Sequence, residues 1–115
     1  MEYAAIEYEQ REATARVSLD RPEALNALND ELLTELEQAV YRAEEAEGVR
    51  ALVIDGNGGA FSSGYDISDA EPDATTDEKV HDQRTHLEAI FSARLPVIAA
   101  VVTAGTLGLG ALSAV

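Results

Sequence analysis

Residues 51–67 read Ala-Leu-Val-Ile-Asp-Gly-Asn-Gly-Gly-Ala-Phe-Ser-Ser-Gly-Tyr-Asp-Ile, a short apolar run that leads into a glycine-rich stretch. The apolar run 51–54 predicts a strand that is buried on both faces. A strand that passes through a glycine-rich loop toward a helix start directs several backbone N–H groups at one point. Such groups stabilise a bound anion or an oxygen that gains charge during a reaction. A second interpretation, in which the glycines serve only the geometry of the turn, stays open.

The residues before this stretch predict a hairpin and a helix. Apolar and polar side chains alternate in 4–9 and again in 13–19, which predicts an antiparallel hairpin with one buried face, ended by Pro22. Asn29 is a candidate helix N-cap, and Gly48 is placed to end that helix. Between them, apolar side chains recur at helical spacing: Leu32, Leu33, Leu36, Ala39, Val40 and Ala43. Strand, strand, helix, strand is the order of a layered α/β or α+β fold.

The residues after the glycine-rich stretch predict a further helix and strand. Residues 68–78 are polar and predict a loop, and a helix is expected from about 76 to 94. Branched residues at 97–102 predict another buried strand. Three glycines at 105, 108 and 110 then predict a second glycine-rich turn before 111–115, so that 95–115 forms a strand, a turn and a helix.

The charge of the chain excludes several classes of partner. The 22 acidic residues outnumber the 8 basic ones and give a net charge of −14, which disfavours nucleic acid and anionic membranes. Such an excess of acid, with Lys79 as the single lysine, resembles proteins of salt-loving microbes and suggests a halophilic archaeon as the source; an ordinary acidic surface is the alternative interpretation. The uncharged residues 95–115 are long enough to cross a bilayer, but their proline and glycines favour a buried segment.

The chain has no cysteine, which excludes disulfides and thiol chemistry and fits a cytoplasmic location. Its N-terminus lacks the basic and apolar regions of a secretory signal. His81 and His86 lie five residues apart, which does not match the spacing of a metal-binding pair on a helix, so no metal site is expected.

Four motifs resemble one known family. They are Leu-Asp-Arg-Pro at 19–22, Asn-Ala-Leu at 26–28, the glycine-rich loop at 56–67, and Pro-Val-Ile-Ala-Ala-Val at 96–101. In this order and spacing they resemble the enoyl-CoA hydratase/isomerase, or crotonase, superfamily over residues 17–115. The resemblance implies a spiral of ββα units that binds acyl-coenzyme A thioesters, of which residues 1–115 would be the incomplete N-terminal part.

The resemblance also implies site residues. Tyr65, which follows Gly64, would donate one backbone N–H to the thioester oxygen. If the alignment with the family pattern allows one extra residue after Val101, the second donor is Leu109. An ungapped alignment makes the second donor Gly108. Residues that would contact the coenzyme A substrate are Glu23, Ala24, Leu25, Gly64, Asp66 and Ile67. Many family members carry a lysine where this chain has Glu23, and an acid there would not pair with a phosphate.

The expected activity is hydration or double-bond isomerisation of an unsaturated acyl-CoA, with no cofactor besides the thioester itself. Hydratases of the family use two glutamates, the first after the second glycine-rich turn, where this chain has Ala111, Leu112 and Ser113. The second would lie beyond Val115. The alternative is therefore a catalytically inactive remnant or an assembly module. Trimers or hexamers of identical chains are usual in the family.

Overall fold

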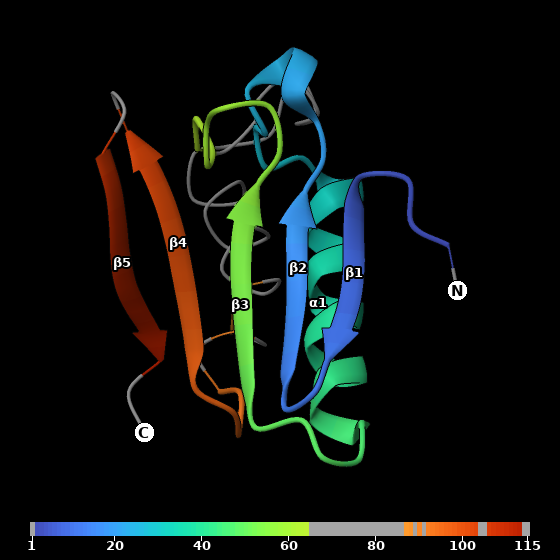
Figure 1. The fold of residues 1–115 in the computed structure, drawn as a ribbon. Helices are drawn as coiled ribbons and strands as arrows, with labels where there is room; N and C mark the ends of the chain where they lie inside the picture. Colours follow the sequence, from blue (N-terminus) through green and yellow to red (C-terminus); the bar gives the residue numbers. More distant parts are fainter. Residues whose placement is uncertain (1, 65–86, 89, 91, 104–105, 114–115) are drawn as a thin grey trace.

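The computed structural model describes residues 2–64, 87, 88, 90, 92–103 and 106–113, and for 101–103 and 106–113 it describes the backbone only. Within these residues the chain forms one five-stranded sheet and a helix that packs on it (Figure 1). The elements are β1 Ile6–Arg11, β2 Thr14–Leu19, the 3₁₀ turn η1 Pro22–Ala24, α1 Asp30–Glu45, β3 Ala51–Gly56, β4 Val97–Thr103 and β5 Thr106–Ser113.

The strands lie in the sheet in chain order, from β1 to β5. β1 and β2 form the predicted antiparallel hairpin, in a register that pairs Ile6 with Leu19 and Arg11 with Thr14. β2, β3 and β4 run parallel to one another. Parallel neighbours need a long crossover between them, and α1 supplies it between β2 and β3. In Figure 1, α1 lies behind β1 and β2, so that the opposite face of the sheet is turned to the viewer.

Helix α1 begins and packs as its sequence predicts. The Asn29 side chain accepts a hydrogen bond from the Leu32 backbone N–H over 2.9 Å, which satisfies one of the N–H groups that a helix start leaves unpaired. The helix ends at Glu45, and Gly48 lies in the turn that follows with a φ of +87°. All six apolar side chains at helical spacing are buried: Leu32, Leu33, Leu36, Ala39, Val40 and Ala43.

The core lies between α1 and one face of the sheet. The buried sheet residues that share it with the helix are Ile6, Ala15, Val17, Leu19, Leu52, Ile54 and Val97. The expectation that the strand at 51–54 is buried on both faces is wrong. Leu52 and Ile54 face the helix and are buried, whereas Val53 faces the other way and is only half-buried. Among the described residues no helix covers that face of β3, which is called the open face below.

The second half of the chain differs from its sequence prediction at one element. Residues 87, 88 and 90 are helical and Ile90 is buried, in agreement with the end of the predicted helix, whose other residues lie outside the described ones. β4 matches the predicted strand. Residues 106–113, however, form strand β5, antiparallel to β4, and not a glycine-rich turn followed by a helix. This strand pairs backbone groups that β4 would otherwise leave open at a sheet edge.

The architecture is therefore a mixed α/β layer that contains one ββα unit and a following parallel strand, as predicted. In the part of the chain that the structure describes, no helix has the length and apolarity needed to span a bilayer.

Candidate functional site

Two segments leave the same edge of the sheet side by side. Leu19, the last residue of β2, pairs with Gly56, the last residue of β3, because these strands are parallel. The chain after β2 (residues 20–29, the β2–α1 segment) and the chain after β3 (residues 56–64, the glycine loop) therefore start as neighbours. The carboxyl edge of parallel strands is where ligands bind in many α/β proteins.

Backbone hydrogen bonds fasten the glycine loop to the β2–α1 segment. The Ser63 N–H donates to the Leu25 carbonyl oxygen over 3.0 Å, and the Leu28 N–H donates to the Gly64 carbonyl oxygen over 2.8 Å. The Leu25 carbonyl belongs to a residue in the left-handed region, with a φ of +53°. The pairing brings the predicted substrate contacts Leu25 and Gly64 to one place.

The Asn26 side chain links the same two segments from inside. It is 0% exposed, and its Oδ1 accepts a hydrogen bond from the Arg21 N–H over 2.7 Å. Its Nδ2 donates to the carbonyl oxygens of Asn57 at 2.8 Å and Ala60 at 2.9 Å. A buried carboxamide must find such partners, since an unpaired polar group in the interior costs about 1–3 kcal/mol. Asn26 thus uses one end of its amide for each segment.

Ser62 extends this link to the end of the loop. Its hydroxyl donates to the Asn26 carbonyl oxygen over 2.7 Å and accepts a hydrogen bond from the Gly64 N–H over 3.1 Å. The loop is therefore held at Asn57, Ala60, Ser62 and Gly64, along its whole described length.

Two glycines of the loop are required by close contacts. A Cβ atom on Gly56 would lie 2.2 Å from the Ala60 carbonyl oxygen, which is far inside van der Waals contact. A Cβ atom on Gly58 would lie 2.5 Å from the Cβ of Pro22 in η1, and Gly58 also has a φ of +86°. The glycines at these positions let the loop fold back on itself and on the β2–α1 segment.

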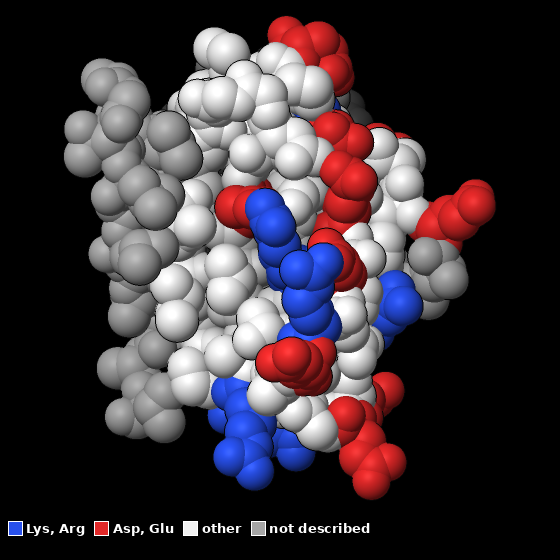
Figure 2. Space-filling view, viewed as in Figure 1, with Lys and Arg blue, Asp and Glu red and all other residues white. Residues whose placement is uncertain are grey.

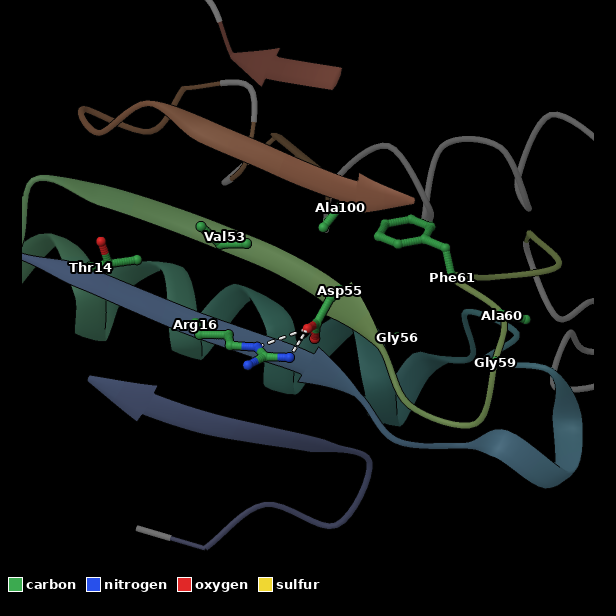
Figure 3. A pocket seen from close by; sticks show the side chains of 9 residues that line it. All are labelled: Thr14, Arg16, Val53, Asp55, Gly56, Gly59, Ala60, Phe61 and Ala100. Atoms are coloured by element: carbon green, nitrogen blue, oxygen red, sulfur yellow. Dashed lines mark hydrogen bonds and ion pairs between the residues drawn. The ribbon is translucent and has the colours of Figure 1, made fainter. Parts of the chain in front are cut away.

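A hollow of about 590 Å³ lies on the open face beside the glycine loop. Figure 3 shows the Phe61 ring directed toward Ala100 of β4, and Arg16 of β2 directed toward Asp55 of β3. The residues that line it are Thr14, Arg16, Val53, Asp55, Gly56, Gly59, Ala60, Phe61 and Ala100.

Charged side chains gather on the open face where it borders β1 (Figure 2). The Arg16 Nε donates to Asp55 Oδ2 over 2.8 Å, and Arg16 Nη2 forms a second hydrogen bond to the same oxygen. The hydrogen bond with Asp55, and then the charge of Asp55, raise the pKa of the Arg16 guanidinium, which stays charged. Among the described residues nothing donates to the other Asp55 oxygen, Oδ1, which is buried.

The structure places only some of the predicted site residues. Glu23 and Ala24 lie in η1, Leu25 follows with 58% of its surface exposed, and Gly64 ends the described part of the loop. The predicted donor and two predicted substrate contacts lie outside the described residues: Tyr65, Asp66 and Ile67.

The two candidates for the second donor lie in β5. Leu109 pairs with Ala100 and Gly108 pairs with Val101 in the β4–β5 ladder. The spacing between either N–H and the first donor is not defined by the described residues, so this pair of donors stays a prediction.

Sequence reasoning missed the roles of Asn26 and Ser62. In the sequence, Asn26 stands out only as part of the Asn-Ala-Leu motif, although a polar residue between Leu25 and Ala27, just before a helix cap, is a signal for a buried turn amide. No group of three potential metal ligands occurs among the described residues, and His81 and His86 lie outside them.

Comparison with known proteins decides the family. The model of the family described as enoyl-CoA hydratase/isomerase matches residues 9–112. The chain belongs to the enoyl-CoA hydratase/isomerase family. This confirms the resemblance drawn from the four motifs.

Individual relatives agree with the family match. A probable enoyl-CoA hydratase of Rhodobacter capsulatus is 43% identical over 103 residues, which are 88% of this chain and 39% of the relative. A solved enoyl-CoA hydratase/isomerase of Xanthobacter autotrophicus Py2 superposes with a TM-score of 0.76 at 37% identity, over 88% of this chain and 39% of that one. A solved enoyl-CoA hydratase subunit of Geobacillus kaustophilus gives 0.78 at 32% identity, with the same coverage. The chain thus spans about two fifths of the length of these relatives.

Proposed function

We propose that this chain binds acyl-CoA thioesters at the carboxyl edge of β2 and β3 and takes part in hydration or double-bond isomerisation of an unsaturated acyl-CoA. The observation that carries the proposal is the glycine loop, fastened to the β2–α1 segment by Asn26, Ser62 and backbone bonds, inside the region that matches the family. Several relatives are described as probable enoyl-CoA hydratases.

The chemistry needs donors for the thioester oxygen. When the α-carbon of the thioester loses a proton or the β-carbon accepts water, negative charge develops on that oxygen. The backbone N–H of Tyr65 and that of Leu109, or of Gly108, would hold it. Each fixed donor of this kind contributes about 3–4 kcal/mol to the stability of the transition state.

The coenzyme end of the substrate would lie along the outer side of the β2–α1 segment. Leu25 offers an exposed apolar surface beside the loop, with Glu23 and Ala24 in the preceding turn. Gly64, Asp66 and Ile67 would complete the contact. Because Glu23 is exposed and acidic, it would repel the phosphates of coenzyme A and weaken binding at low salt.

The setting proposed for this function is a cytoplasm of high salt content, as in a halophilic archaeon, with identical chains assembled as trimers or hexamers. The net charge of −14 supports the high-salt setting, since salt screens the repulsion among so many acids. No metal or organic cofactor is part of the proposal.

The test uses the protein at the length that its source cells make, in concentrated KCl. Binding of hexanoyl-CoA is measured by titration calorimetry, and turnover of a 2-enoyl-CoA and a 3-enoyl-CoA is followed by the absorbance of the conjugated thioester. Saturable binding with loss of 2-enoyl absorbance indicates hydration, and a gain from the 3-enoyl substrate indicates isomerisation. A protein that binds none of the three ligands, hexanoyl-CoA, the 2-enoyl-CoA and the 3-enoyl-CoA, contradicts the proposal.

A second function, acyl-CoA binding or assembly without catalysis, is favoured by one observation on the sequence. Residues 111–113, where the resemblance implies the first hydratase glutamate, are Ala, Leu and Ser and carry no carboxylate that could act as a base. The same experiment separates the two functions, because the second predicts binding or assembly with no turnover of either enoyl substrate.

A further inference from the structure

The Gly64 residue is held on both sides of its α-carbon. Its N–H donates to the Ser62 hydroxyl over 3.1 Å, and its carbonyl oxygen accepts from the Leu28 N–H over 2.8 Å. Gly64 has a φ of +100°, a conformation that glycine adopts without strain but that glycine also leaves easily. The two hydrogen bonds therefore fix a residue that would otherwise rotate.

A peptide group is planar and almost always trans, so its carbonyl and its N–H point in opposite directions. Whatever fixes the Gly64 carbonyl consequently fixes the N–H of the next residue, which is the donor assigned to the thioester oxygen in the proposed function. The Leu28 N–H holds the Gly64 carbonyl toward the β2–α1 segment.

We propose that Asn26 and Ser62 are positioning residues, which hold the glycine loop against the β2–α1 segment. They thereby fix the peptide bond between Gly64 and Tyr65, whose N–H would donate to the substrate oxygen. The inference rests on the proposed function for the identity of that oxygen. Neither side chain touches the substrate, and both act through the Gly64 peptide.

The network has one continuous path. Asn26 Nδ2 donates to the backbone carbonyls of Asn57 and Ala60. The backbone carbonyl of Asn26 accepts a hydrogen bond from the Ser62 hydroxyl, and that hydroxyl accepts one from the Gly64 N–H. Only a carboxamide offers both donors and an acceptor at the buried end of this path. An aspartate in its place would face two carbonyl oxygens with no proton to donate, which is why Asn26→Asp is an informative near-isosteric change.

A role limited to stability is the competing explanation. It predicts that changes in this network lower the melting temperature but leave the geometry of the bound thioester unaltered in the folded fraction. A positioning role predicts altered geometry even where the protein stays folded. The vibrational frequency of the bound thioester carbonyl distinguishes the two, since it falls as the donors polarise the bond.

The experiment compares Ser62→Ala with Ser63→Ala in the full-length protein, because Ser63 is the exposed neighbour and its hydroxyl makes no hydrogen bond in the described structure. The infrared carbonyl band of isotope-labelled hexanoyl-CoA is recorded in each complex, with kcat and KM for an enoyl-CoA substrate. Ser62→Ala is expected to shift the band back toward its position in water and to lower kcat about tenfold with little change in KM, while Ser63→Ala leaves both unchanged. Asn26→Asp is expected to act in the same direction and more strongly.

Amide hydrogen exchange in the protein without ligand makes the inference testable independently of the proposed function. In Ser62→Ala, exchange at the Gly64 amide, which loses its acceptor, and at the Leu28 amide, which donates to the Gly64 carbonyl, is expected to quicken at least about tenfold, and in Ser63→Ala to stay as in the parent protein. If the parent protein binds no acyl-CoA but exchange responds this way, the proposed function fails and the positioning network stands. If the parent protein binds and shows a lowered carbonyl frequency, but Ser62→Ala and Asn26→Asp change neither frequency nor exchange, the inference is overturned and the function stands.

Discussion

Glu23 stands where the resemblance implies a lysine in many family members, and its exposed carboxylate lies in the turn before Leu25. Replacing it with lysine is expected to tighten hexanoyl-CoA binding about three- to tenfold at low salt, because one repulsive charge becomes attractive. The measurement is titration calorimetry at two salt concentrations.

Glu23→Gln is the matched control, since it removes the acid without adding a base and should give about half of the effect in free energy. Equal affinities for the parent protein and Glu23→Lys at low salt would show that the coenzyme does not lie along η1.

The partly buried phenol of Tyr8 predicts how the stability of the fold changes at alkaline pH. Burial raises the pKa of its phenol above 10.0, although the charge of Arg42, whose guanidinium carbon lies 4.1 Å from the ring centre, offsets part of the increase. Because the folded-state pKa is the higher one, this stabilisation is complete below about pH 10 and is lost as the pH rises through the folded-state pKa. Tyr8→Phe is therefore expected to lose less thermal stability than the parent protein as the pH rises above about 10.

The control is Tyr41→Phe, because Tyr41 is 51% exposed. Thermal melting curves for the three proteins across the alkaline range provide the measurement. A parent protein and Tyr8→Phe with parallel stability curves in that range would rule out the contribution of Tyr8.

Residues whose partners lie near in sequence could be predicted, and residues with distant partners could not. Asn29 was recognised as a cap because its partner, the Leu32 N–H, is three residues away. The role of Asn26 depends on Asn57 and Ala60, which are 31 and 34 residues away. Nothing local in the sequence states that the chain returns there, so that part of the candidate site had to come from the structure.

At the scale of elements, the glycine loop and η1 form one unit through the contact of Gly58 with Pro22. Gly58→Ala is expected to destabilise the protein by about 2–4 kcal/mol, since a Cβ would collide with the proline and the positive φ would be strained. Gly59→Ala has a similar φ of +88° but no atom within 4 Å of the added Cβ, and is expected to cost only about 1 kcal/mol.

The difference between these two variants in denaturant unfolding isolates the contact with η1 from backbone strain. Equal destabilisation would mean that the loop and the turn do not touch.

Elements with a strong periodic signal were predicted correctly, and the exceptions have a physical cause. The apolar stripe of α1, and the alternation of apolar and polar side chains in β1 and β2, each repeat often enough to identify the element. Residues 106–113 contain two glycines, Gly108 and Gly110, which locally favour a turn, but pairing with β4 makes them a strand. No feature of the sequence indicated the open face of β3, because an apolar run alone does not show whether one or both faces of a strand are covered.

At the scale of the whole molecule, the net charge of −14 on 115 residues predicts that salt stabilises the fold. Raising KCl from about 0.1 M to about 1 M shortens the screening length from about 10 Å to about 3 Å and weakens the repulsion among surface acids. The melting temperature is expected to rise by several degrees over this range.

Neutralising two exposed acids should reduce the salt effect. The variant Glu45→Gln/Glu47→Gln is expected to melt higher than the parent protein at low salt and to gain less from added KCl. A melting temperature that falls with salt would show that attractive ion pairs, such as Arg16 with Asp55, outweigh the repulsion.

The central claim is that the loop after β3 holds the carbonyl oxygen of an acyl-CoA thioester. The most direct test compares the affinity for hexanoyl-CoA with that for S-hexyl-CoA, a thioether that keeps the chain and the coenzyme but lacks the oxygen. Two backbone donors to that oxygen predict that the thioester binds about tenfold more tightly or better. Equal affinities for the two ligands would contradict the account, because the site would then recognise the coenzyme and the chain without the group on which the chemistry depends.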